Sequence, residues 1–186
     1  MADLSSAEAA LLGLLCEGEM HAYQLEKTVA YRSMRDWTDL SMSSIYKVMR
    51  KLEKTGLAVS RSDITKSNKI RKTYAVTATG RKAIQAQLLK WLEEPETIKY
   101  RLDLAVYNFN HIPRAKALKA LKAYRQALGK GIKCYWQLEK FLVKDGCPSF
   151  RLALARRPRH LLAAERDWVD AFVKEMGGKG RVGGEK

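Results

Sequence analysis

Cysteine is scarce in this sequence of 186 residues: the three cysteines stand at positions 16, 134 and 147, and no two form a CxxC pair. Any disulfide scheme would leave one thiol unpaired, which argues against a disulfide-stabilised secreted protein and favours reduced thiols in the cytoplasm. No apolar run reaches the ~18–20 residues that a membrane-spanning helix needs, so we expect no membrane partner. The N-terminal segment lacks a basic leader, so we expect no signal peptide.

Residues typical of catalytic and metal sites are also sparse. The three histidines, at positions 21, 111 and 160, are scattered and lack the spacing of metal ligands. The segment Gly129-Lys130-Gly131 is too short to be a phosphate-binding loop. Acidic residues fall mainly on charged faces of predicted helices. We therefore predict that the protein is not an enzyme and that it uses no metal or other cofactor.

Acidic residues are few compared with basic ones: 20 Asp and Glu against 35 Lys and Arg give a net charge of +15. Residues 1–46 contain three basic and seven acidic residues, whereas residues 47–72 contain nine and two. Residues 81–186 add 23 basic and 11 acidic residues. The overall charge suits a polyanionic partner. The excess of basic residues in residues 81–186 is compatible both with contacts to flanking DNA and with an ordinary solvated helical surface.

The most informative stretch that is present covers residues 41–80. Its first part predicts an amphipathic helix, because apolar residues recur at intervals of three and four: Ile45, Val48, Met49 and Leu52. Ser41 or Ser43 would cap the start of this helix, and Gly56 would follow its end in a left-handed conformation.

The opposite side of this predicted helix is basic. It contains Ser43, Lys47, Arg50 and Lys54, with Tyr46 and Lys51 on the flanks. A charged stripe usually means a solvated face. Here Glu53 is the one acid beside four cations, which solubility does not require, and we therefore favour a binding face.

A basic hairpin follows this helix. Residues 57–62 and 70–76 alternate as two short strands do, and residues 65–68 are typical of a turn. Tyr74 and Val76 share one face of the second strand and would pack the hairpin onto the helices. Five basic residues surround the turn: Arg61, Lys66, Lys69, Arg71 and Lys72. An ordinary basic surface hairpin has the same pattern. The position of this hairpin directly after a basic helix nevertheless favours a wing.

This order predicts a mainly α protein with a winged helix-turn-helix domain and a two-stranded wing, which would place a helix in the major groove and a basic arm beside the phosphates. The candidate DNA-binding residues are Ser43, Ser44, Tyr46, Lys47, Arg50, Lys51, Lys54, Arg61, Lys66, Lys69, Arg71 and Lys72. Arg50 best suits a guanine edge. The alternative is a basic helical adaptor for RNA or a membrane surface, which would not need cations on both helix and wing.

Other helices are predicted around this stretch. Ser5 and Glu8 form a capping box before an apolar first helix, in which Cys16 would belong to the core. A second helix near residues 21–31 offers Tyr23, Leu25 and Val29 to the core. Trp37 is expected to be a packing anchor rather than a DNA contact. Thr77 would cap a helix that runs to about Trp91.

Residues 4 to about 92 resemble the PadR family of transcriptional regulators. The resemblance is carried by Leu11-Leu12-Gly13-Leu14-Leu15, Ser43-Ser44-Ile45-Tyr46, Leu52-Glu53, Gly56-Leu57 and Arg71-Lys72-x-Tyr74-x-Val76-Thr77-x-x-Gly80. It implies a dimeric winged helix-turn-helix, usually a repressor and often released by a small molecule. The sequence departs from the family at Ala22, Ser43 and Lys47, where such proteins usually have Gly, Gly and Pro.

The second region is predicted to be an all-helical dimerisation domain over residues 94–176, after a DNA-binding domain over residues 1–93. A stripe of Ile98, Leu102, Ala105 and Phe109 precedes a long helix over residues 113–145, where Gly129 and Gly131 would allow a kink. A short segment after Pro148 and a separate last helix should follow. A helix of about thirty residues spans roughly 45 Å, so a second chain is the expected cover for its apolar seam. An intrachain three-helix bundle is the alternative. Residues 177–186 are predicted to be disordered.

Aromatic residues gather in or beside this helical region, and a cavity that they line would suit a flat aromatic effector. The candidate effector-binding residues are Trp91, Tyr100, Tyr107, Trp136 and Trp168. For most of them, a place in an interface core, where aromatic residues are common, is the favoured explanation.

Overall fold

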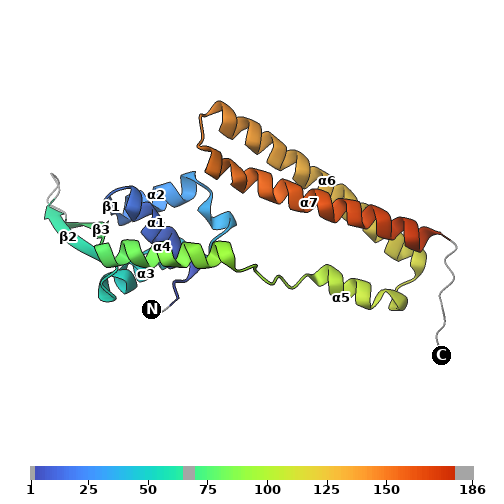
Figure 1. Cartoon of the computed structure of the whole chain (residues 1–186), viewed down its shortest axis with the longest axis horizontal. Coiled ribbons are helices and arrows are strands. Elements are labelled where there is room, and N and C mark those ends of the chain that lie inside the picture. The colour runs from blue at the N-terminus through green and yellow to red at the C-terminus, as the bar shows by residue number, and fades with distance from the viewer. Residues whose placement is uncertain (1–2, 65–69, 179–186) are drawn as a thin grey trace. The chain divides into compact units, whose positions relative to one another are not determined.

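A computed structural model describes residues 3–64 and 70–178, and the chain divides into two compact units, Met1–Ile98 and Lys99–Lys186. Each unit has a hydrophobic core of its own. The first unit is a winged helix-turn-helix and the second is all-helical (Figure 1), so the predicted fold class is confirmed.

The first unit contains four α-helices, among its described residues, around a small antiparallel sheet. The elements in chain order are α1 (Ser6–Glu17), β1 (Met20–His21), α2 (Ala22–Tyr31), the 3-10 turn η1 (Met34–Asp36), α3 (Met42–Lys54), β2 (Ala58–Ile64), β3 (Ile70–Val76) and α4 (Ala78–Glu93). The strand order is β1-β3-β2, so β1 adds a third strand that the sequence did not predict. β2 and β3 extend away from the helices of this unit as a wing (Figure 1).

The core of this unit is formed by the apolar stripes that the helical periods predict. Fully buried side chains come from α1, α2 and α3: Leu11, Leu12, Leu15, Leu25, Val29, Ile45, Met49 and Leu52. Cys16 is partly buried against this core.

Two aromatic residues differ from the prediction. Tyr23 is 58% exposed because it lies two residues before Leu25 and therefore on the opposite side of α2; its ring instead stacks on His21 and holds Lys27 at 4.8 Å. Trp37 follows η1 and is about half exposed, so it is not a core anchor.

The junction of α3, β2 and α4 depends on two glycines and a threonine. Gly56 has a φ of 71° and ends α3 as predicted. The Thr77 hydroxyl accepts a hydrogen bond from the Gly80 N–H at 2.9 Å and donates to the Gly56 carbonyl at 2.8 Å. A Cβ on Gly80 would lie 2.0 Å from the Leu57 carbonyl oxygen, so only glycine lets α4 approach the start of β2 this closely.

The second unit contains α5 (Arg101–Tyr107), the 3-10 turn η2 (Phe109–His111), α6 (Arg114–Lys144) and α7 (Ser149–Gly177). α6 and α7 lie side by side as an antiparallel pair (Figure 1). Three side-chain contacts fix their register: Arg125 with Asp170, Tyr124 with Glu165, and Glu139 with Arg156. Leu102 and Phe109 pack against the core of this pair, whereas Ala105 and Ile98 are exposed.

The helical pair corrects two expectations about its helices. The segment after Pro148 is not separate: α7 is one helix of 29 residues with Pro158 inside it, and it buries Leu152 and Ala155 before the proline and Val169 after it. α6 is also one helix through Gly131, whose missing side chain accommodates α7, since a Cβ there would lie 3.0 Å from Leu162.

Within residues 3–64 and 70–178, no helix is long and apolar enough to cross a bilayer, and no group of His, Cys, Asp and Glu could hold a metal ion. Of the predicted tail, residues 179–186 lie outside the described part of the chain.

Candidate nucleic-acid interface

Helix α3 is fixed at its start by a capping box and along its length by an apolar stripe. The Ser41 hydroxyl accepts a hydrogen bond from the Ser44 N–H at 3.1 Å, and the Ser44 hydroxyl accepts one from the Ser41 N–H at 2.7 Å. Ser41 is therefore the cap. Ile45, Met49 and Leu52 are fully buried, so the rotation of α3 about its axis is set by the core.

The opposite face of α3 is open to solvent. It presents Ser43, Tyr46, Lys47, Arg50 and Lys54. Lys47, Arg50 and Lys54 form no ion pair with any other residue in the described part of the chain. Three unneutralised cations thus stand along one helical face of a small domain. Such a row of positive charges attracts the negatively charged backbone of a nucleic acid.

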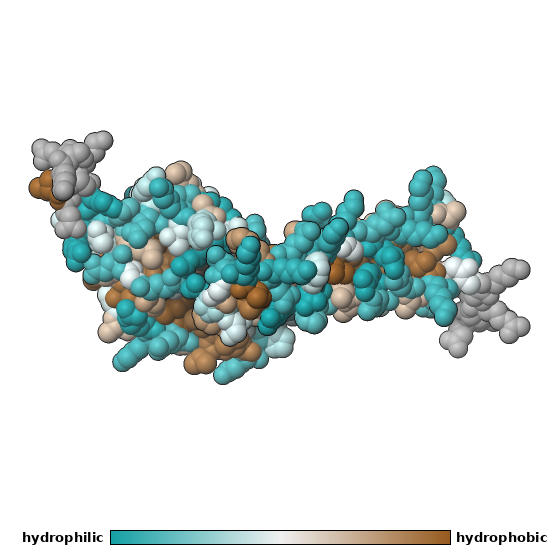
Figure 2. Space-filling view, turned by 90° about the horizontal axis from the view of Figure 1, so that it is seen from above, coloured by the Kyte–Doolittle hydropathy of each residue, from teal (hydrophilic) through white to brown (hydrophobic). Residues whose placement is uncertain are grey.

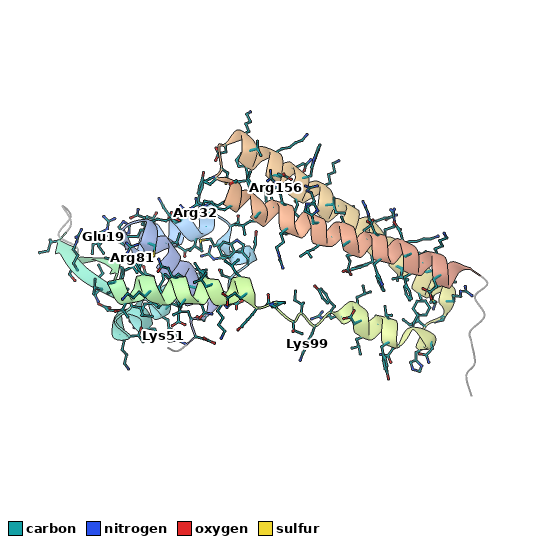
Figure 3. All side chains as sticks on the ribbon, viewed as in Figure 1. Glu19, Arg32, Lys51, Arg81, Lys99 and Arg156 are labelled. Carbon is teal, nitrogen blue, oxygen red and sulfur yellow. The ribbon has the colours of Figure 1, made fainter. Side chains whose placement is uncertain are left out.

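Two candidate residues on α3 already have partners within the protein. The Ser44 hydroxyl is occupied in the capping box, and it also donates to the Ser41 carbonyl at 2.8 Å. Lys51 Nζ lies 2.8 Å from Oε1 of Glu8, a carboxylate on α1 that is almost fully buried (Figure 3 labels Lys51). Burial alone would raise the pKa of Glu8, but hydrogen bonds from Lys51 and Ser5 outweigh it and the pKa is lowered. The ion pair therefore ties α3 to α1.

The wing's basic side chains leave the sheet on two different faces, because neighbours along a strand alternate. Lys72 lies on the α3 side, 3.4 Å from Glu53, which also accepts a hydrogen bond from Ser60. Arg61 points to the other side and lies 2.9 Å from Glu19 (Figure 3 labels Glu19). Arg71 is exposed. Burial lowers the pKa of the His21 imidazole, and the positive charge of nearby Arg71 lowers it further. Lys66 and Lys69 lie outside the described residues.

Two functional acids were not recognised in the sequence. Glu8 was assigned only to the capping box, which it forms, but it also holds Lys51. Glu53 was noted only as the exception in a basic stripe, yet it connects α3 to the wing through Ser60 and Lys72. A single acidic residue within a basic stripe can therefore indicate an ion pair that joins two elements of the fold.

The candidate effector residues do not meet through their rings: among the described residues, no ring contact joins any two of the five. Each of the five side chains is more than 40% exposed. In the second unit Trp168 stacks on Phe172 at 5.2 Å, and Trp136 holds the Lys140 ammonium 3.5 Å from its ring centre. Trp136 also lines a shallow hollow with Glu139, Lys140, Val143 and Arg159.

Comparison with known proteins identifies the protein family that the first unit matches. Residues 11–86, which run from α1 through the sheet into α4, match the transcriptional regulator PadR-like family. The N-terminal unit is a PadR-like domain. The family is one of transcriptional regulators and indicates no enzymatic reaction. A curated relative, the negative transcriptional regulator PadR of Bacillus subtilis (strain 168), is 27% identical over 113 residues, which are 61% of this chain and 62% of the relative.

Solved structures extend the similarity beyond the PadR-like domain. Bacillus subtilis PadR in complex with operator DNA gives a TM-score of 0.74 at 20% identity, over 91% of this chain and 98% of that one. The same protein in complex with p-coumaric acid gives 0.76 at 17% identity, over 96% and 100%. The Vibrio cholerae virulence activator AphA gives 0.64 at 16% identity, over 92% and 98%. At these low identities, the TM-scores show a shared fold alone, and the coverage includes the helical second unit.

Proposed function

We propose that this protein is a homodimeric, sequence-specific DNA-binding repressor of transcription that acts in the cytoplasm. The observation that carries the proposal is the solvent face of α3, opposite a fully buried stripe. On this face Lys47, Arg50 and Lys54 have no acidic partner among the residues that the structure describes. A PadR-like domain supports the assignment, and so does the operator complex of the Bacillus subtilis protein.

In this proposal α3 enters the major groove. Arg50 reads a base edge, while Ser43 and Lys47 lie nearer the start of the helix, where groove contacts usually occur. Tyr46, Lys54 and the wing residues Arg61, Lys66, Lys69, Arg71 and Lys72 contact phosphates, which fix the register but carry no sequence information. Ser44 and Lys51 hold α3 in position.

The apolar seam of α6, which was expected to be covered by a second chain, is covered by α7 of the same chain. The support for the homodimer comes instead from an exposed seam on α7. Starting at Phe150, positions spaced alternately by four and three residues are almost all apolar: Phe150, Leu154, Leu161, Ala164, Trp168 and Ala171, with Arg157 the single exception. All of them are exposed, although α7 already packs against α6 through another face. This spacing is that of a helix that pairs with a further helix. Figure 2 shows hydrophobic patches interrupting the hydrophilic surface of the molecule.

Arg50→Ala should lose sequence discrimination. The guanidinium fork matches the two acceptors of guanine, so its removal should cost about 1–3 kcal/mol on the operator and much less on random duplex. The measurement is the ratio of the two dissociation constants at one salt concentration, with the operator defined by protection of genomic DNA. Arg71→Ala is the matched control, because loss of a phosphate contact should weaken both duplexes alike and reduce the log–log salt slope by about 0.9 for each lost contact. An unchanged ratio in Arg50→Ala would show that Arg50 does not read a base.

We also propose that a flat aromatic compound releases the repressor from DNA. The p-coumaric acid complex of the Bacillus subtilis protein supports this chemistry, as do the exposed aromatic residues of the second unit. Such a ligand regulates only if it binds one spacing of the two DNA-binding units better than the other.

The effector prediction is tested by titrating planar aromatic acids while following tryptophan fluorescence and operator affinity together. Both signals should change over the same concentration range, with operator affinity falling by roughly 5–150-fold. A saturated cyclic acid of similar size is the control for planarity. Quenching without a change in operator affinity would separate binding from regulation, and no response in either signal would assign the aromatic residues to packing.

A further inference from the structure

The outward face of α6 is dominated by lysine and glutamine. On a helical wheel, thirteen positions fall within the third of the circumference opposite the buried Ala117, Leu121 and Leu128, and nine of them are lysine or glutamine. The other four are Ala115, Ala123, Cys134 and Phe141. This lysine row consists of Lys116, Lys119, Lys122, Gln126, Lys130, Lys133, Gln137, Lys140 and Lys144. All nine side chains are exposed, and no acidic residue interrupts them.

The row is not neutralised from within the described protein. Glu139 is the single acid of α6, and it faces α7, where it pairs with Arg156 and Arg159 (Figure 3 labels Arg156). Asp170 of α7 pairs with Arg125, which lies outside the row. No described residue forms an ion pair with a lysine of the row, and the Lys140 ammonium lies over the ring of Trp136. Seven positive charges therefore point to solvent along one line.

The length and spacing of the row suit a nucleic-acid backbone. From Lys116 to Lys144 the helix rises about 42 Å, and its lysines recur mostly every three or four residues, or every ~4.5–6 Å. A duplex also presents its charges at regular intervals over such a length, so several lysines can approach phosphates at the same time.

The composition of this face narrows the class of partner. Phe141 is its one aromatic residue, whereas proteins that hold single strands stack successive bases on several aromatic side chains. Its other positions outside the row, Ala115, Ala123 and Cys134, have small side chains, and α6 turns its apolar stripe to α7, so this face lacks the hydrophobic anchor of a membrane-surface helix. Lysines repeated along one helical face favour the backbone of double-stranded DNA.

We propose that the lysine row of α6 is a second DNA-backbone surface, which binds duplex DNA outside the operator. It rests on the proposed DNA-binding function and adds to it a contact that does not involve the winged helix. It would increase the affinity for long DNA without changing which operator α3 selects.

The test replaces four lysines of the row with glutamine in the full-length protein: Lys119→Gln, Lys130→Gln, Lys133→Gln and Lys144→Gln together. Glutamine is a good helix former, so α6 should persist. The matched control replaces the same four residues with arginine, which keeps the charge. Three duplexes are compared: the operator alone, the operator with long flanks, and a long random duplex. Binding to single-stranded RNA and to anionic vesicles is measured alongside them.

The glutamine variant should bind the operator alone as the wild type does. On both long duplexes it should bind at least tenfold more weakly at moderate salt, with a log–log salt slope reduced by about 0.9 for each lost phosphate contact. The arginine variant should match the wild type on all three duplexes.

Equal binding of the wild type and the glutamine variant to both long duplexes would overturn the proposal and leave the row as a solvated surface. A loss confined to single-stranded RNA or to anionic vesicles would overturn it in favour of another partner. A wild type that does not prefer its operator over random duplex would instead count against sequence-specific regulation, while the comparison on long random duplex would still decide the role of the row.

Discussion

The Gly80→Ala variant should melt far below the wild-type protein. An added Cβ would lie 2.0 Å from the Leu57 carbonyl oxygen and 3.0 Å from a methyl group of Val76. The first of these neighbours is backbone, held where the Thr77 N–H also donates to the Leu57 carbonyl, so it cannot move aside as a side-chain end could. Relieving the contact requires α4 to separate from the start of β2. We expect a loss of about 3 kcal/mol in the free energy of unfolding, at the upper end for overpacking.

Thermal unfolding followed by circular dichroism measures this effect. For a unit of this size, a loss of that magnitude lowers the melting temperature by roughly 12–24 °C. Gly13→Ala is the matched control, since it makes the same change within α1, where no atom lies within 4 Å of the added Cβ. Alanine is the better helix former, so the control should gain about 0.5–1 kcal/mol. A Gly80→Ala variant that melts with the wild type would show that α4 does not pack on Leu57.

The elements of the first unit could be predicted because their signals are local. The Ser41 cap, the stripe of Ile45, Met49 and Leu52, and the left-handed Gly56 all lie within one helix and its ends, and each is confirmed. Alternation and turn residues likewise located β2 and β3 to within two residues at their ends. β1 was missed because two residues are too few to show a period.

The contacts of the candidate interface could not be predicted in the same way, since they join residues far apart in the chain. Nothing near Lys51 in the sequence indicates Glu8, 43 residues earlier, as its partner. Similarly, Arg61 and Lys72 look equivalent as wing cations, but the register of the sheet turns them to opposite faces, one toward Glu19 and one toward Glu53. The sequence therefore indicates which residues are basic, and the fold determines which of them lack partners.

Long helices pose a related problem. The sequence predicted a short segment after Pro148 and then a separate last helix. α7 is instead one helix that continues through Pro158, although proline removes a hydrogen-bond donor and disfavours the interior of a helix. Buried side chains and the Arg156–Glu139 pair lie before the proline, and the core shared with α6 lies after it. Similarly, Gly131 looked like a kink, although it marks the close approach of α7. Local rules failed where packing between the two helices outweighs them.

Leu161→Glu should convert the protein to a monomer. Leu161 is near the middle of the exposed α7 seam, where its neighbours along the seam are Arg157 and Ala164. In a homodimer each substitution acts twice: two leucine side chains lose burial worth about 1.5–3 kcal/mol each, and two carboxylates enter an apolar contact. The dimer dissociation constant should therefore rise by roughly 10²–10⁴-fold. Sedimentation over a range of concentrations measures the change.

The control Ala127→Glu introduces the same side chain at an exposed position of α6, outside both the seam and the lysine row, and should remain a dimer. Arg157→Leu offers the converse test. It replaces the single charged residue of the seam with an apolar one, and the dimer should dissociate less readily. If Leu161→Glu sediments as the wild type does, the α7 seam is not the dimer contact, and another face must join the two copies.

Leu161→Glu should therefore weaken dimerisation and binding to the full operator together. A two-fold dimer reads an inverted repeat, with half-sites about one helical turn apart or a multiple of it, so each PadR-like domain raises the local concentration of the other at its half-site. A monomeric Leu161→Glu variant still has an intact α3 and should bind a single half-site as the wild-type domain does, but it should lose roughly 10²-fold or more on the full operator. Equal loss on the half-site and on the full operator would mean that the substitution damages the fold rather than the pairing of the two copies.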